Sequence, residues 1–572
     1  MKKALVLLLV LVFSSSWRIC AAPGDAVDWY LYFYSNTYSL DGNVGRFIET
    51  ETYGVYLLEG CEVTASGINF CVHNEAWSSM YGWADGGSVN ATGVDYPVAV
   101  ATAATGWLAL PAGTYDVTFN LSALTIRFDT AIESHDEYPM PDLNGDYLRG
   151  GDISMLTYVE SFGAKFYDAD GTEKDVIDIM KENGCNIVRL RLYNNPGTPV
   201  TYSNNTYKVP AGYLDEADVL RLARRAKKKG LRVQLSFHYS DFWTNGGIQF
   251  KPHDWQELTL DGLKTAIYNY TKQFLQKMKQ QGTTPEYVSL GNEIESGFLF
   301  GDATAMDAVN GGWNKPANQA ALLGKASQAV REVCPESKII IHYTLSQNIG
   351  WTRYKTLLTN LKNNGYTDYD IVGTSYYPYW TDQKPTMLNS LANNVYNNFG
   401  KELLVMETGY SWTQYRPSGR NGGNYEGQLH MNGTPYNEAS KEGQKAFMEE
   451  LHGVIEDNSH LLGYLYWDPI MVDQKVNNKW IETAWAYRQD GDNWWQDGNI
   501  VSNTTWFDYE GKALPVLEAI KAAADAATGL EIIDNGKLKI DNDDVFDLQG
   551  RRRVNPTKGL YIVGGKKVVI SK

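Results

Sequence analysis

The sequence predicts an α/β protein built on a (β/α)8 barrel, with an all-β module before the barrel and a small β module after it. Short apolar runs alternate with longer helical segments over residues 151–527, which is the pattern of a parallel barrel. Alternating apolar and polar residues fill 26–131 and return at 530–572. At roughly 150 residues per domain, a chain of 572 residues has room for all three parts.

The N-terminus predicts export. Residues 1–22 contain two lysines, an apolar run of about ten residues and small residues near Ala21 and Ala22, which is the pattern of a secretory signal peptide. The run is too short to be a good membrane-spanning helix, and no later segment has the apolar length to span a membrane. We therefore expect a secreted protein, or one at the cell surface or in the periplasm. Lipidation of Cys20 is the alternative, although Arg18 does not suit a lipoprotein signal.

Residues 26–131 read as a β-sandwich, because short alternating strands follow one another with glycine-rich turns. The stretch "LPAGTYDVTFNLSALTIRF" predicts two strands joined by a polar turn, and it resembles the small sandwich modules of Bacteroidetes surface glycan-binding proteins. Trp77, Tyr81 and Trp83 are candidates for a sugar-stacking platform. Packing in the core or against loops is the favoured interpretation of these three aromatic residues.

The cysteines carry little chemistry. An exported compartment would permit a disulfide between Cys61 and Cys71. Cys185 and Cys334 fall in core segments, where we expect small buried side chains. No cysteine or histidine spacing matches a zinc site.

Composition disfavours a polyanionic partner, whereas a neutral polymer would be indifferent to the charge of the chain. The net charge of −16 disfavours a polyanion such as nucleic acid. Aromatic residues make up 13% of the chain, and flat aromatic side chains suit the apolar faces of sugar rings.

The barrel is expected after a polar, proline-containing linker at 132–150. Eight strands are predicted, at "ISMLTYV" (153–159), "NIVRLRLY" (186–193), "LRVQLSFHY" (231–239), "EYVSLGNE" (286–293), "KIIIHYT" (338–344), "YDIVGTSYYP" (369–378), "LLVMETG" (403–409) and "LLGYLYWD" (461–468). Active sites of such barrels form at the C-terminal ends of the strands. Polar and aromatic candidates stand at those ends: Arg189, Arg191, His238, Asp241, Asn292, Glu293, His342, Tyr376, Tyr377, Glu407, Trp467 and Asp468.

Two glutamates give the strongest indication of function. Glu293 ends strand 4 and Glu407 ends strand 7, so their carboxylates are predicted to face each other across the barrel. Such a pair is what glycoside hydrolysis requires: one group protonates the leaving oxygen, and the other attacks the sugar or activates water. We expect Arg191 to hold Glu407 ionised and a drier setting to keep Glu293 protonated, with Arg189 bracing the barrel interior.

Further substrate-binding residues are predicted around this pair. Asn292 is placed to donate to a sugar hydroxyl, and Trp380 and Trp467 to stack on sugar rings. His238, Asp241 and Tyr377 complete the set, with either Tyr376 or Tyr377 bonding to Glu407. Glu295 is interpreted as loop structure.

Six motifs together resemble the arabinogalactan endo-β-1,4-galactanases of glycoside hydrolase family 53. They are "RLRLYNNP", "SFHYSDFW", "SLGNEIESG", "GTSYYPYW", "LLVMETGY" and "WFDYEGKALPVLEA", in that order over roughly residues 152–525. The resemblance implies a retaining endo-acting enzyme of a multidomain Bacteroidetes type, which cleaves the β-1,4-galactan side chains of pectin. It also implies that Glu293 is the acid/base and Glu407 the nucleophile, with carboxyl groups ~5–5.5 Å apart.

The chain departs from the family pattern at three places. Tyr193 stands where tryptophan is usual, Asp468 where glutamate is usual, and "IHYTLSQN" replaces the common strand-5 pattern. The changes in strands 5 and 8 affect the expected subsite specificity rather than the catalytic pair. A related barrel β-glycanase acting on mannan, xylan or glucan is the alternative, and a non-catalytic surface glycan-binding protein is a second one.

No cofactor or catalytic metal is required by this chemistry. The acidic run at 490–499 offers oxygen ligands for a structural Ca²⁺, as in some family members, but a solvated turn is the favoured interpretation. Residues 530–572 resemble the C-terminal sorting or anchoring domains of Bacteroidetes exported proteins, so attachment to the cell surface is expected there. Gly564 and Gly565 predict a hairpin, and an accessory β-module is the alternative.

Overall fold

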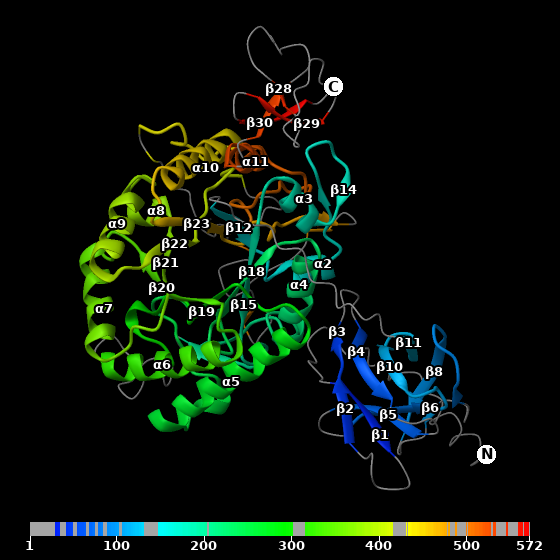
Figure 1. The fold of residues 1–572 in the computed structure, drawn as a ribbon. Helices are drawn as coiled ribbons and strands as arrows, with labels where there is room; N and C mark the ends of the chain where they lie inside the picture. Colours follow the sequence, from blue (N-terminus) through cyan, green and yellow to red (C-terminus); the bar gives the residue numbers. More distant parts are fainter. Residues whose placement is uncertain are drawn as a thin grey trace, which may run out of the picture. The chain divides into compact units, whose positions relative to one another are not determined.

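The barrel predicted from the sequence is present in the computed structural model (Figure 1). The structure describes residues 29–34, 42–49, 54–63, 68–74, 78–83, 88–101, 106–130, 147–202, 205–300, 315–415, 431, 433–476, 479–480, 487–488, 499, 501–527, 530–533, 545–546, 559–563 and 566–570. The predicted signal peptide, Cys20, Trp77 and most of the acidic run at 490–499 lie outside these residues.

Eight parallel strands close the barrel, and each pairs with the next in chain order. They are β12 (Leu148–Asp152), β15 (Ile187–Leu192), β18 (Arg232–Phe237), β19 (Tyr287–Leu290), β20 (Lys338–Leu345), β21 (Ile371–Tyr376), β22 (Glu402–Glu407) and β23 (Leu461–Tyr466). All six residues of β15, β18 and β21 are buried, as expected for parallel strands covered on both faces.

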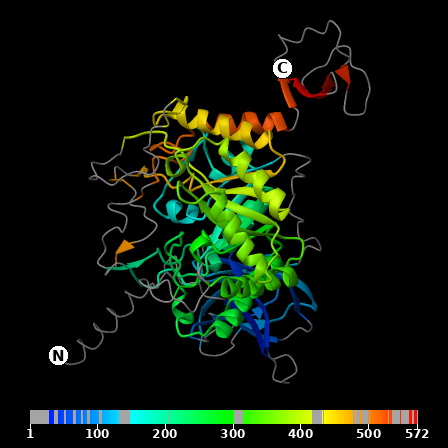
Figure 2. The same cartoon turned by 90° about the vertical axis from the view of Figure 1, so that its left-hand side faces the viewer.

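Helices follow the strands and surround the barrel (Figure 1). In chain order they are α2 (Leu156–Ser161), α3 (Val176–Glu182), α4 (Glu216–Lys228), α5 (Leu260–Gln280), α6 (Pro316–Val333), α7 (Trp351–Asn363), α8 (Pro378–Thr381), α9 (Met387–Phe399), α10 (Lys441–Glu456) and α11 (Val516–Ala527). Two short 3₁₀ helices, η1 (His253–Trp255) and η2 (Ile294–Ser296), occupy loops. The helices α10 and α11 pack against each other, and Figure 2 shows them in yellow and orange.

The first barrel strand corrects the sequence prediction. It runs over Leu148–Asp152, whereas the second half of the predicted strand at 153–159 belongs to the helix α2. A Cβ atom at Gly150 would lie 1.9 Å from the carbonyl oxygen of Ile187, so the neighbouring strand approaches too closely for any side chain. This close approach explains why a strand at this position contains glycine. The barrel therefore starts within the segment that was predicted as a linker.

Small antiparallel sheets lie in the loops of the barrel. They comprise β13 (Phe166–Tyr167) with β14 (Glu173–Lys174), β16 (Val200–Tyr202) with β17 (Asn205–Lys208) and β26 (Tyr487–Arg488), and β24 (Lys475–Val476) with β25 (Lys479–Trp480). Cys185 and Cys334 are free and buried, which confirms the expectation for these two residues.

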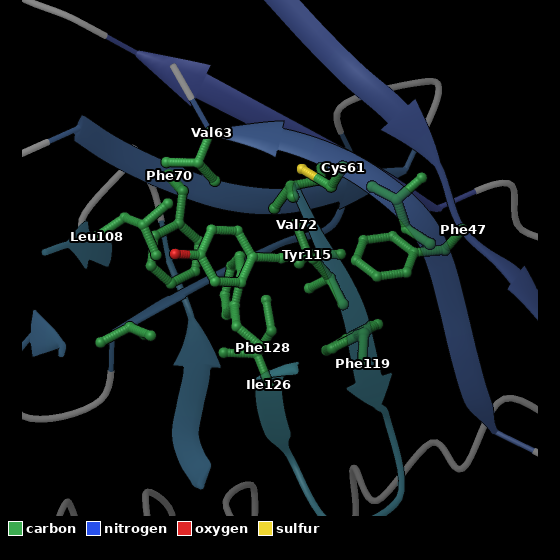
Figure 3. Packing of buried hydrophobic residues seen from close by; sticks show 14 of the residues in the cluster. Phe47, Cys61, Val63, Phe70, Val72, Leu108, Tyr115, Phe119, Ile126 and Phe128 are labelled. Atoms are coloured by element: carbon green, nitrogen blue, oxygen red, sulfur yellow. The ribbon is translucent and has the colours of Figure 1, made fainter. Parts of the chain in front are cut away.

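The N-terminal module is all β. Its strands are β1 (Trp29–Tyr34), β2 (Gly42–Arg46), β3 (Ile48–Glu49), β4 (Val55–Val63), β5 (Ile68–Asn74), β6 (Met80–Trp83), β7 (Ser88–Val89), β8 (Asp95–Val100), β9 (Gly106–Leu108), β10 (Gly113–Asn120) and β11 (Thr125–Thr130). Figure 3 shows their buried side chains, including Phe70, Val72, Phe119 and Phe128, converging between the strands.

Two expectations for this module are settled by the structure. Cys61 and Cys71 are free and buried, so the disulfide that the compartment would permit is not formed. Tyr81 is partly buried and packs against the core, with its ring 5.4 Å from that of Trp29, which agrees with the favoured interpretation. Glycan binding by the module remains a prediction.

The C-terminal module contains a four-stranded sheet of β27 (Leu530–Ile533), β30 (Lys566–Ile570), β29 (Gly559–Val563) and β28 (Val545–Phe546), in that spatial order. Val563 pairs with Lys566 in an antiparallel register, which confirms the hairpin predicted at Gly564 and Gly565. Its sorting or anchoring role remains a prediction. Among the described residues, no helix combines the length and the apolar character needed to cross a membrane.

Candidate active site

An open cleft of about 730 Å³ lies at the C-terminal ends of the barrel strands. Its walls include both predicted glutamates and several aromatic side chains. They are lined by Trp243, Thr244, Asn245, Asn292, Glu293, Glu295, Thr344, Gln347, Ser375, Tyr377, Tyr379, Trp380, Glu407 and Trp467, among others.

Glu293 and Glu407 meet in this cleft. One oxygen of each carboxylate lies within 4.8 Å of the other, and both side chains are buried, with residue exposures of 8% and 5%. Glu293 lies three residues beyond the end of β19 and has a left-handed backbone, with φ of 53° and ψ of 55°. A residue other than glycine held in that region is strained, and such strain gathers at functional sites.

Arg189 holds Glu407. The guanidinium Nη1 donates to Glu407 Oε1 at 2.6 Å, and Nη2 donates to Asn292 Oδ1 at 2.7 Å. Tyr377 donates its hydroxyl to Glu407 Oε2 at 3.2 Å. Burial raises the pKa of Glu407, whereas the charge and hydrogen bond of Arg189 oppose this rise.

The predicted roles of the two arginines are exchanged. Arg191 was expected beside Glu407, but its Nη2 donates to Asp468 at 2.6 Å and its Nε lies 3.1 Å from Asp152. Both arginines point into the barrel because they are two residues apart on β15. The stagger of the strands decides which of them reaches Glu407.

Glu293 ends a chain of hydrogen bonds. His342 Nε2 lies 2.8 Å from Ser375 Oγ, and Ser375 Oγ donates to Glu293 Oε1 at 2.6 Å. Burial and the neighbouring charges of Glu407 and Glu295 raise the pKa of Glu293 well above its usual range. Burial also lowers the pKa of His342 well below its usual range, so the imidazole is neutral.

Asn292 is fixed from both sides. Its Nδ2 donates to the carbonyl of Thr244 at 2.9 Å, while its Oδ1 accepts from Arg189. The hydroxyl of Thr244 lies 2.7 Å from His238 Nδ1. His238 therefore supports the loop that orients Asn292.

Three of the predicted binding residues are not among the side chains that line the cleft. His238 and Arg191 lie behind its wall, and Asp241 accepts the backbone N–H of His253 at 2.7 Å. Burial raises the pKa of Asp241 to about 6. Direct substrate contacts of these three residues remain predictions.

The aromatic residues divide by exposure. Trp380 lines the cleft and is 55% exposed, so its ring is available for stacking. Trp467 is only 6% exposed, and the guanidinium carbon of Arg191 lies 4.4 Å from its ring centroid. Trp467 thus covers the buried arginines as well as lining the cleft.

Ser375 and Glu295 are among the cleft residues that the sequence did not predict. Ser375 lies two residues before Tyr377 near the end of β21, and this shared face was the available signal. Glu295 was interpreted as loop structure, but it is buried in the cleft wall. The left-handed turn at Glu293 interrupts the strand alternation, so no periodic signal could have placed Glu295.

Among the described residues, Glu293, His342 and Glu407 form the one group close enough to share a metal ion. Glu407 already pairs with Arg189, and Glu293 and His342 are both bonded to Ser375. The side chains of all three residues are thus held by other protein groups, so we do not assign them as metal ligands. The expected calcium site at 490–499 lies almost entirely outside the described residues.

A (β/α)8 barrel with two opposed, buried carboxylates in an aromatic-walled cleft has the architecture of the barrel glycoside hydrolases. The sequence model of glycosyl hydrolase family 53 matches residues 148–520. The chain belongs to this family, and its barrel is a glycoside hydrolase domain.

Similar proteins agree with this placement. An endo-β-1,4-galactanase of Bacillus subtilis is 31% identical over 398 residues, which cover 67% of this chain and 87% of that protein. An arabinogalactan endo-β-1,4-galactanase of Cellvibrio japonicus is 28% identical, covering 68% of this chain and 94% of that protein. The solved family 53 catalytic domain of Ignisphaera aggregans superposes with a TM-score of 0.56 at 31% identity, covering 67% of this chain and 98% of that one.

Proposed function

We propose that this chain is an exported, retaining endo-β-1,4-galactanase that cleaves galactan side chains of pectin. Family membership and the names of its relatives support the reaction and the substrate. The observation that carries the mechanism is the approach of the Glu293 and Glu407 carboxylate oxygens to within 4.8 Å.

This separation favours retention of configuration. Retaining glycosidases hold their carboxyl groups ~5–5.5 Å apart, whereas inverting ones need ~6.5–9.5 Å to admit a water molecule between carboxylate and sugar. An oxygen pair within 4.8 Å fits the shorter of these two separations. It therefore favours direct attack of the second carboxylate on the sugar.

The proton distribution assigns the two roles. Glu407, held by the Arg189 guanidinium, is the anion that attacks the anomeric carbon and forms a glycosyl ester. Glu293 has the more strongly raised pKa and donates its proton to the departing glycosidic oxygen. In the second step, Glu293 takes a proton from water, the water oxygen bonds to the anomeric carbon, and Glu407 leaves.

The cleft supports an endo mode of action. Its volume of about 730 Å³ and its open form admit several sugar units of a chain. The Asn292 carboxamide is held by Thr244 and Arg189, and its Nδ2 keeps a second hydrogen to donate to a sugar hydroxyl. Trp380 provides a stacking surface farther along the cleft.

The test is the release of reducing ends from linear β-1,4-galactan by the wild type and by Glu407→Ala. Glu402→Ala is a matched control, because Glu402 begins the same strand and pairs with His460 away from the cleft. We expect short oligomers from the wild type and from Glu402→Ala, and a loss on the order of 10⁴-fold for Glu407→Ala. An active Glu407→Ala variant would refute the nucleophile, and an inactive wild type would refute the substrate and lead to mannan, xylan and glucan.

Export and surface attachment rest on the sequence of 1–22 and 530–572. Fractionation of the native host would place the protein in the medium, the envelope or the cytoplasm. Cytoplasmic protein with an intact N-terminus would refute export. Loss of envelope attachment after deletion of 530–572 is expected if this module anchors the chain.

A further inference from the structure

A third carboxylate, that of Glu295, lies in the same cleft and has no part in the two steps above. The residue is 2% exposed and lies on η2, two positions after Glu293. Thr344 Oγ1 donates to Glu295 Oε1 at 2.7 Å, and the backbone N–H of Thr344 donates to Oε2 at 3.1 Å. Both carboxylate oxygens are thus held by one residue of β20.

The loop after β18 closes over this carboxylate. A Cβ atom at Gly246 would lie 2.1 Å from Glu295 Oε1, so a side chain at this position would push the carboxylate aside. Arg353 of α7 donates to the backbone carbonyl of Glu295 at 3.2 Å. The side chain is therefore both desolvated and fixed in position, which is unusual for a residue with only a loop role.

The charged and titratable groups around Glu295 come from three elements. They are Glu293 at the end of β19, Tyr343 on β20, and Arg353 and Tyr354 on α7. Burial raises the pKa of Glu295 to about 7, against the hydrogen bonds of Thr344 and the charge of Arg353. Its negative charge in turn contributes to the raised pKa of Glu293, after burial and Glu407.

We propose that Glu295 is a positioning residue for the catalytic proton: its carboxylate, fixed by Thr344 beneath Gly246, repels negative charge on Glu293 and so retains the proton there. This inference rests on the acid/base role proposed for Glu293. As the pH rises, Glu295 becomes ionised, and the repulsion then opposes loss of the proton from Glu293. The acid therefore stays protonated to a higher pH than it would alone.

The test is the pH dependence of kcat/KM on β-1,4-galactan for wild type, Glu295→Gln and Thr344→Val. Glu295→Gln removes the charge, so the alkaline limb moves to lower pH by roughly half a unit to one unit. Thr344→Val removes one donor to the carboxylate, which leaves Glu295 neutral to higher pH and gives a smaller shift in the same direction. The acid limb, which reports Glu407, stays in place in both variants.

A Glu295→Gln variant with the wild-type alkaline limb would overturn the inference, as would an equal loss of kcat/KM at every pH. Should Glu295→Gln fail to fold, Thr344→Val decides, and an unmoved limb overturns the proposal. Other outcomes would refute the proposed function rather than the role of Glu295. An inactive wild type on galactan refutes the substrate, and the limb is then measured on whichever glycan of the panel is hydrolysed. An active Glu293→Gln variant refutes the acid/base role.

Discussion

Replacing Arg189 with methionine tests how the nucleophile is kept ionised. Arg189 is fully buried and donates to Glu407, Asn292, the carbonyl of Met406 and Ser236 Oγ. Methionine fills similar space but leaves Glu407 with only the Tyr377 hydroxyl at 3.2 Å. Removing one partner of a buried ion pair costs ~3–5 kcal/mol, so we expect the melting temperature of the barrel to fall by several degrees.

The same change should also act on the pH profile. Without the guanidinium, the pKa of Glu407 rises further, because Arg189 is what opposes the effect of burial. The nucleophile must be ionised to react, so the acid limb of kcat/KM moves to higher pH. We expect a loss of at least ~10³-fold in kcat/KM at neutral pH.

Two variants serve as controls for this prediction. Arg189→Lys keeps the positive charge but cannot bond Glu407 and Asn292 together, so an intermediate activity is expected. Lys165→Met breaks an exposed ion pair with Glu173 and should leave activity and melting temperature unchanged. Activity of Arg189→Met within about tenfold of wild type, with an unmoved acid limb, would refute the reasoning.

Three further predictions concern the acid, the cleft wall and the thiols. Ser375→Ala removes a hydrogen-bond donor to ionised Glu293, so the pKa of Glu293 rises and the alkaline limb of kcat/KM moves to higher pH. A shift of this limb to lower pH would contradict the hydrogen bond at 2.6 Å. Trp380→Ala removes an exposed stacking surface, so KM for galactan should rise about tenfold with little change in kcat, and an unchanged KM would exclude stacking. Thiol titration of the chain without residues 1–22 should find no reactive group in the native state, because Cys61, Cys71, Cys185 and Cys334 are buried. After unfolding all four thiols should react, and rapid reaction of the native protein would contradict their burial.

The barrel was predictable because its signals are local and repeated. Parallel strands such as β15 and β21 are buried on both faces and read as apolar runs, and glutamates at the ends of β19 and β22 stand out from those runs. The first strand was not predicted, because Gly150 and Gly151 stand in place of apolar residues where neighbouring chain segments come close. Glycines that make room for a neighbour carry no periodic signal.

The contacts within the site were less predictable. Arg189 and Arg191 share a face of β15, and sequence parity cannot say which one reaches Glu407, because that depends on the stagger between strands. Glu295 depends on the left-handed turn at Glu293, which redirects the chain out of the strand pattern. The sequence thus predicts where a site residue lies along its strand. The residues that it contacts across the barrel depend on how the strands are staggered when the barrel closes.

The most direct test of double displacement is the configuration of the first product. Proton NMR can follow the anomeric signals of oligosaccharides released from β-1,4-galactan in the first minutes, before mutarotation mixes them. With carboxylate oxygens of Glu293 and Glu407 within 4.8 Å, we expect the β-anomer to appear first and the α-anomer to follow by mutarotation. Initial release of the α-anomer would mean inversion by a single displacement and would contradict the assignment of Glu407 as nucleophile.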